Sequence, residues 1–206
     1  MSKKGIFLFD IDKTLFDTPK FIEVTSEKLA KLLEVDLSDI SLLDKEYTST
    51  LKHNIDFDPE TFADFLCRRF GFKNKKLIED IYYTEKSYYE RNVFSDVKEV
   101  LNKLIVGFNL GIFSEGTKRF QNHKFRSLGL NDYFGKDIIF IQDAKDTEEI
   151  VKELPVGAVI VDDKEDICEF VTKHGFHAIW LNKKDNKVSD KFQTIHHLTE
   201  LPSMLL

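Results

Sequence analysis

The sequence has only two cysteines, and it lacks both a long apolar run and an excess of basic residues. Cys67 and Cys168 form no CxxC pair, which argues against a disulfide framework, a zinc site or a redox pair. Buried thiols in a reducing cytoplasm are the simpler interpretation. The apolar run that follows MSKKG stops within a few residues, too short for a signal peptide or a membrane span. We therefore expect a soluble cytoplasmic protein that does not act at a membrane.

The charge of the chain excludes one further class of partner. Its 36 acidic residues exceed its 30 lysines and arginines, which leaves a net charge of −6, and the two signs are interspersed. This pattern lacks the basic stripe that binding to a nucleic-acid backbone requires. Nothing in the sequence implies a protein partner. With 42% hydrophobic residues among 206, the chain can fill a core.

Short apolar runs alternate with helical patterns through most of the sequence. The run IFLF after Gly5 is typical of a strand buried on both faces. Such alternation predicts an α/β fold, a Rossmann-like parallel sheet with helices on both faces. The further expected strands are 109–113, 137–141, 157–161 and 177–181, and the expected helices are 97–105, 117–128 and 164–174.

Residues 18–93 interrupt this alternation, because they carry helical patterns and little that resembles a strand. We expect an all-helical cap here, inserted into a core made of residues 1–17 and 94–206. Its expected helices cover roughly 19–33, a segment that opens at Asp58-Pro59, and about 74–92. The tyrosines of the last segment are interpreted as helix packing.

Acidic side chains follow several of the predicted strands. Asp10, Asp12 and Thr14 come after the first, Ser114-Glu115-Gly116 after the second, and Asp162-Asp163 after the fourth. In an open parallel sheet, ligands bind beyond the carboxyl ends of the strands, so these groups should converge. Clustered carboxylates repel one another unless a cation lies among them, and an all-oxygen set suits Mg²⁺. We expect Asp10, Asp12, Asp163 and Asp162 to be its ligands.

The neighbouring residue types indicate a phosphate substrate. The Ser114 hydroxyl and the backbone N–H groups of the 114–117 turn together form an anion cradle. A lysine should complete it, and Lys145 is preferred because it is expected to begin the helix after strand 137–141. Lys118 and Lys124 are the alternatives, although a solvated helix face is the ordinary explanation for both.

The order of these motifs resembles that of the haloacid dehalogenase superfamily of Mg²⁺-dependent phosphatases and phosphotransferases. The motifs are DxDxT at residues 10–14, then a serine, a lysine and an Asp-Asp pair, and the insertion resembles the superfamily's helical type 1 cap. The resemblance implies that Asp10 is the nucleophile that forms an aspartyl-phosphate and that Asp12 is the general acid and base. Thr14 would position the loop. The dehalogenase branch lacks an acid at the position of Asp12, so Asp12 favours phosphate esters.

Two departures from the superfamily pattern concern acidic residues. Glu115 stands where a small polar residue is usual, so it could turn away, pair with a cation such as Lys118 or Arg119, or contact a basic part of the substrate. Asp166 lies three positions after Asp163, where the usual interval is four. Asp163 is the preferred metal ligand, followed by Asp162.

The predicted activity is hydrolysis of a small phosphorylated metabolite with Mg²⁺. A phosphomutase or other phosphotransferase would share the intermediate, and a catalytically silent phosphate-binding module would share the fold. A receiver module of signalling proteins is disfavoured by the order of the motifs. His53 in the cap is a further candidate for contact with the substrate.

Overall fold

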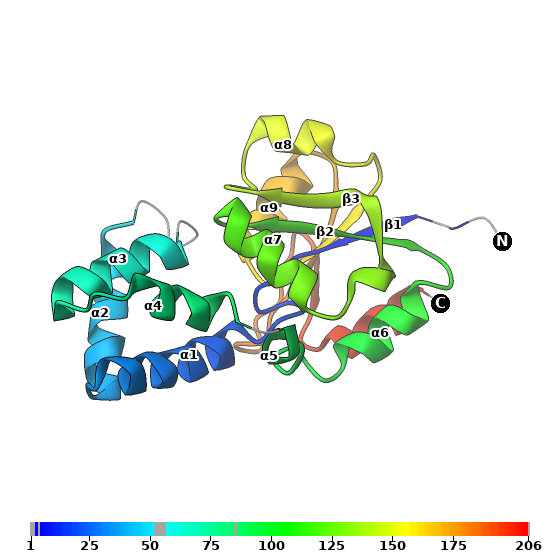
Figure 1. Cartoon of the computed structure of the whole chain (residues 1–206). Coiled ribbons are helices and arrows are strands. Elements are labelled where there is room, and N and C mark those ends of the chain that lie inside the picture. The colour runs from blue at the N-terminus through cyan, green and yellow to red at the C-terminus, as the bar shows by residue number, and fades with distance from the viewer. Residues whose placement is uncertain (1–2, 4, 52–56, 85, 206) are drawn as a thin grey trace.

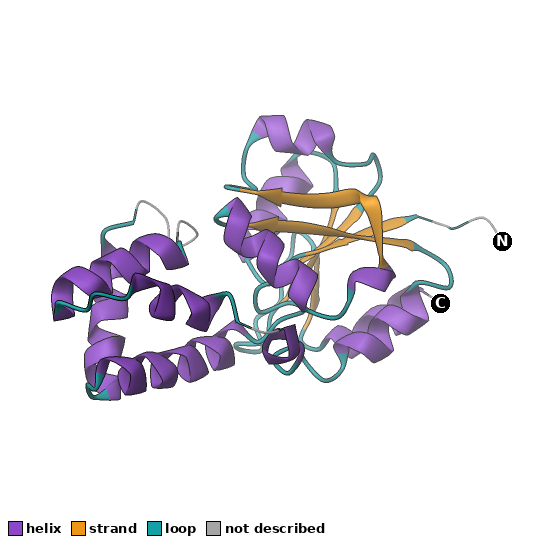
Figure 2. Ribbon diagram, in the orientation of Figure 1, coloured by secondary structure: helices purple, strands orange, loops and turns teal. Residues whose placement is uncertain are grey.

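The computed structural model describes residue 3 and residues 5–51, 57–84 and 86–205. Its core is a six-stranded, entirely parallel sheet in the order β3-β2-β1-β4-β5-β6, which confirms the expected α/β class (Figure 2). The strands are β1 (Ile6–Phe9), β2 (Asn109–Glu115), β3 (Phe134–Gln142), β4 (Val159–Asp162), β5 (His177–Leu181) and β6 (Gln193–Ile195).

The side chains of β1 show how helices cover both faces of the sheet. Phe7 and Phe9 are fully buried in one apolar cluster, together with residues of the helices on that side. Leu8 points the opposite way, into a second cluster, as the two-residue repeat of a strand requires. The first face is covered by α6 (Val97–Leu104), α7 (Lys118–Ser127) and η3 (Leu198–Leu205), and the second by α9 (Glu165–Lys173).

The insertion forms a separate helical layer that projects from the carboxyl ends of the strands (Figure 1). Its first helix begins after Asp17, whose carboxylate accepts a hydrogen bond from the Lys20 backbone N–H at 3.2 Å. Asp58 caps the third helix and Pro59 is its first residue, as the sequence predicts. We call α1 (Thr18–Leu33), α2 (Leu37–Ser49), α3 (Pro59–Phe70) and α4 (Lys75–Tyr82) the cap helices.

Several local features of the described chain differ from the expectations. The helix α2 was missed, although Ile40, Leu43 and Tyr47 are buried at helical spacing. The segment expected as one helix over 74–92 breaks at Tyr83, after which α5 (Lys86–Glu90) begins. The edge strand β6 was not expected. The helix α8 (Glu148–Glu153) begins after Lys145, so the expectation that Lys145 starts this helix is wrong.

No helix in the described part of the chain is long and apolar enough to cross a membrane. His53 lies outside the described residues.

Candidate active site

Asp10 follows the last residue of β1, and β1 lies between β2 and β4 in the sheet. Its backbone N–H donates to the Val161 carbonyl at 3.0 Å, which extends the pairing of β1 with β4. The Ser114 hydroxyl at the end of β2 donates to Asp10 Oδ1 at 3.0 Å. The backbone of Asp10 is therefore tied to β4 and its side chain to β2. The expected contact of Ser114 with substrate stays a prediction.

Lys145 is a fully buried cation beneath this aspartate. Its Nζ donates to Asp10 Oδ1 at 2.7 Å and also to Asp162 Oδ2. Burial acts to lower the pKa of Lys145, but Asp10, Asp162 and Glu115 outweigh it, and the pKa is raised. Lys145 therefore stays protonated and orients Asp10, because a buried charge is tolerated only when it is paired.

Asp163 joins Asp10 and Asp162 in a group that has the composition of a cation site. Each of the three offers a carboxylate oxygen, and these oxygens lie within 4.8 Å of one another. Burial, reinforced by the charge of Asp10, raises the pKa of Asp163 to about 6. Burial also raises the pKa of Asp162 to about 7, although Lys145 opposes the shift. One lysine thus does not neutralise three carboxylates, and an all-oxygen group with surplus negative charge fits Mg²⁺.

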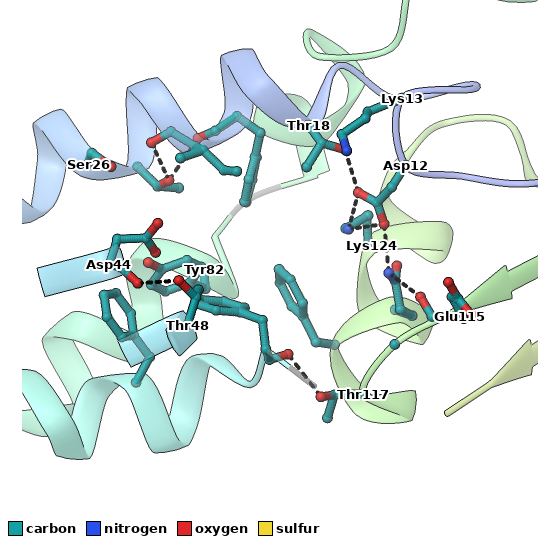
Figure 3. A pocket seen from close by; sticks show the side chains of 18 of the residues that line it. Asp12, Lys13, Thr18, Ser26, Asp44, Thr48, Tyr82, Glu115, Thr117 and Lys124 are labelled. Carbon is teal, nitrogen blue, oxygen red and sulfur yellow. Dashed lines mark hydrogen bonds and ion pairs between the residues drawn. The ribbon is translucent and has the colours of Figure 1, made fainter. Parts of the chain in front are cut away.

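Asp12 belongs to a different set of contacts. Its carboxylate accepts hydrogen bonds from Lys124 Nζ at 2.7 Å to each oxygen, from Gln121 Nε2 at 2.7 Å, and from the Thr18 hydroxyl (Figure 3). Burial acts to raise the pKa of Asp12, but the Lys124 charge and these hydrogen bonds outweigh it and lower the pKa. The Asp12 carboxylate is not a member of the three-carboxylate group, so its assignment as a metal ligand stays a prediction.

Lys124 contradicts its expected place on a solvated helix face. Its side chain is only 4% exposed and extends from α7 to Asp12. Gln121 and Lys124 share the buried face of α7 with Phe120 and Phe125. In the sequence, the polar residues Gln121 and Lys124 occupy helix positions that an apolar stripe would normally fill. This pattern could have indicated that the face contacts a functional site.

Glu115 is neutralised inside the protein. Its carboxylate accepts from Lys164 Nζ and, at 2.9 Å, from the Lys145 backbone N–H. Burial acts to raise the pKa of Glu115, but Lys145 and Lys164 outweigh it, so the pKa is lowered. Of the three alternatives for Glu115, pairing with a cation is the one observed, although the cation is Lys164 rather than Lys118 or Arg119.

Thr14 and Gly116 occupy two backbone turns around the site. Thr14 is fully buried, and its Oγ1 has no hydrogen-bond partner within the described residues. Its carbonyl accepts from Lys183 Nζ at 3.3 Å, which ties the loop to the end of β5. Gly116 has φ +130°, and a Cβ there would lie 2.9 Å from Gln121 Nε2, so glycine allows Gln121 to reach Asp12.

A cavity of about 410 Å³ connects these groups to the cap helices. On the core side it is lined by Asp10, Asp12, Asp163 and Gly116, together with the side chains of three lysines. The lysines are Lys13, Lys124 and Lys164. Ser114, Lys145 and Asp162 are fully buried and form the support of the site rather than its wall.

A family model described as "Haloacid dehalogenase-like hydrolase" matches residues 7–154, which is more than half of the chain. The chain belongs to this family of hydrolases. The expected superfamily is thereby confirmed.

Among curated proteins, a glyceraldehyde 3-phosphate phosphatase from Pyrococcus abyssi is 28% identical over 147 residues. These residues are 65% of this chain and 58% of the relative, so the match spans less than two thirds of the relative's length.

Solved structures of the family share the fold at low sequence identity. The HAD-hydrolase YfnB from Bacillus subtilis, solved bound to magnesium, has a TM-score of 0.69 and 19% identity, covering 99% of each chain. A haloacid dehalogenase-like hydrolase from Burkholderia xenovorans has a TM-score of 0.75 and 17% identity, covering 98% of this chain and 97% of that one. A 2-haloacid dehalogenase from Pseudomonas syringae has a TM-score of 0.63 and 19% identity, covering 99% and 98%.

Proposed function

We propose that this hydrolase is a Mg²⁺-dependent phosphatase that removes phosphate from a small metabolite in the cytoplasm. The observation that carries the proposal is the pair Asp10 and Asp12, two carboxylates that line one cavity with different partners. Cleavage of a phosphate ester needs a nucleophile and a separate proton donor for the alkoxide, whereas loss of a halide needs no proton donor. The phosphatase from Pyrococcus abyssi supports the same substrate class.

The reaction follows from the contacts of these two residues. Asp10 attacks phosphorus, a bond from its carboxylate oxygen to phosphorus forms, and the ester P–O bond breaks as Asp12 protonates the leaving alkoxide. Asp12 then takes a proton from water, which attacks the same phosphorus; the bond between phosphorus and the Asp10 oxygen breaks, phosphate leaves, and the Asp10 carboxylate is restored. Lys145 keeps Asp10 oriented, and the lysines that line the cavity attract the phosphate. A bound Mg²⁺ would supply charge neutralisation at Asp10, Asp162 and Asp163.

The test is phosphate release from a panel of phosphorylated small metabolites that includes glyceraldehyde 3-phosphate. Each ester is assayed with Mg²⁺ and with excess EDTA, and 2-chloropropionate is assayed for chloride release. We expect turnover of at least one ester that stops when Mg²⁺ is removed and returns when it is restored. Chloride release without any ester turnover would show a dehalogenase. Isomerisation of a sugar phosphate faster than phosphate release would show a mutase, and phosphate binding without turnover would show a silent module.

The contact of Lys124 with Asp12 gives a second expectation. Replacing Lys124 by methionine removes the charge that lowers the pKa of Asp12, so a larger fraction of Asp12 is protonated at a given pH. In a plot of kcat/KM against pH, the limb that falls with rising pH should shift to higher pH by roughly 1 pH unit. The control is Lys118→Met, an exposed lysine on the same helix. An unchanged profile in Lys124→Met would contradict the assignment of Asp12 as the acid.

A further inference from the structure

Two carboxylates that line the cavity have no role in the reaction described above, Glu115 on the core side and Asp44 on the cap side. Asp44 lies on the cap helix α2 and lines the same cavity as Asp10 and Asp12. In Figure 3 it faces the cavity from the cap side, opposite Asp12 and Lys124 on the core side. The cavity therefore has an acidic group at each end.

Asp44 differs from Asp12 and Glu115 because no residue that the structure describes pairs with its carboxylate. Asp12 and Glu115 are each bound by a lysine, whereas the described residues offer the Asp44 side chain neither a hydrogen bond nor an ion pair. Burial raises the pKa of Asp44. A half-buried carboxylate without a partner is costly in the free protein, so a cationic group of a ligand would relieve that cost.

The surroundings of Asp44 are aromatic. Five rings line the cavity with it, those of Phe21, Phe57, Phe62, Phe120 and Tyr82. The pKa of Tyr82 is raised by burial and then by the charge of Asp44, which places the tyrosine within electrostatic reach of the carboxylate. Aromatic faces and a carboxylate are the combination that binds ammonium groups, the rings through their quadrupole and the acid through its charge.

The lysines of the cavity lie at its core end, together with four carboxylates, whereas Asp44 is the one charged residue that lines the cap end among the described residues. Lys13, Lys124 and Lys164 line the core side, where an anionic phosphate would lie. The cap side combines Asp44 with aromatic and aliphatic side chains and with the hydroxyl residues Thr25, Ser26 and Thr48. A molecule that carries a phosphate at one end and a cation at the other complements both ends.

We propose that the substrate is a phosphomonoester whose leaving alcohol carries an ammonium group, and that this group pairs with Asp44. The inference rests on the proposed phosphatase activity and names its substrate class. The short aliphatic or aromatic part of such an alcohol would occupy the apolar middle of the 410 Å³ cavity.

The test compares three esters of matched size, 3-aminopropyl phosphate, 3-hydroxypropyl phosphate and butyl phosphate, together with a series of ω-aminoalkyl phosphates of increasing length. For the best chain length we expect kcat/KM of the amine to exceed that of its alkyl analogue by about 10- to 100-fold, the range of a charge-assisted hydrogen bond. Asp44→Asn should abolish this preference, so that in the variant the kcat/KM values of the amine and of butyl phosphate lie within about twofold of each other.

A second readout does not depend on turnover. The free amino alcohol should raise the melting temperature of the wild-type protein but not that of Asp44→Asn. The matched control is Asp39→Asn, an exposed aspartate on the same helix, which should keep both the preference and the shift. The melting temperature of Asp44→Asn alone should equal or exceed that of the wild type, since the variant removes an unpaired carboxylate.

The outcomes separate the two proposals. Equal turnover of the amine, hydroxyl and alkyl esters by the wild type would overturn the ammonium proposal and leave the phosphatase intact. Preference for the hydroxyl ester would overturn it in favour of a neutral polyol substrate. If no ester is turned over but the amino alcohol still stabilises only proteins that retain Asp44, the phosphatase assignment fails and the ammonium site stands.

Discussion

Asp10→Asn is expected to lower kcat on a phosphate ester by about 10⁴- to 10⁶-fold, the effect of removing a nucleophile that other groups cannot replace. The amide has almost the same shape as the carboxylate, so the substitution removes the charge and the nucleophilicity rather than the packing. The cavity and its lysines are retained in the variant, so the substrate should still bind.

Asp10 also pairs with Lys145, so folding of the variant has to be shown separately. A cooperative melting transition provides that evidence, and Asp132→Asn, at an exposed aspartate that does not line the cavity, is the control for the substitution itself. Activity of Asp10→Asn within tenfold of the wild type, with a folded protein, would contradict the role of Asp10 as nucleophile.

Asp12→Asn is expected to have a smaller effect that depends on the leaving group. On an alkyl phosphate, kcat should fall by about 10²- to 10⁴-fold, because the alkoxide leaves without a proton donor. On p-nitrophenyl phosphate the leaving group needs no proton, so the first step should be nearly unaffected. The second step still needs a base to activate water.

The measurement is a burst experiment with p-nitrophenyl phosphate. Asp12→Asn should release about one equivalent of p-nitrophenolate rapidly and then turn over slowly, since the phosphorylated protein accumulates. An equal loss of rate on the activated and the alkyl ester, with no burst, would mean that Asp12 has only a structural role. Lys124 would then neutralise the charge of Asp12 and would have no role in setting the pKa of a catalytic acid.

The carboxyl-end rule for parallel sheets is the reason that the core of the site was predictable. Asp10, Ser114 and Asp162 each end a strand, and neighbouring strands bring their ends together whatever the loops do. The fold class followed from the same alternation of apolar runs and helical patterns. β6 was missed because its three residues are too few to show a pattern.

Contacts between side chains of elements far apart in the sequence are harder to predict from the sequence. The partner of Glu115 is Lys164, which the chain places after β4, and no local pattern relates the two. Lys124 was read as a surface residue because a lysine on a helix usually is one, and its buried face becomes evident only when α7 is placed against the loop of Asp12. Asp44 could not be singled out, since α2 itself was not expected.

The most direct test of the account is to trap the phosphorylated protein and locate the phosphate. The wild-type protein with Mg²⁺ and a turned-over phosphomonoester is quenched in acid and treated with borohydride, which reduces an aspartyl-phosphate to homoserine, and its peptides are then mapped by mass. We expect homoserine at position 10, only when substrate and Mg²⁺ are both present. Modification at any other residue would contradict the assignment of Asp10 as the nucleophile. Continued turnover with position 10 unmodified, in both the wild type and Asp12→Asn, would also contradict it.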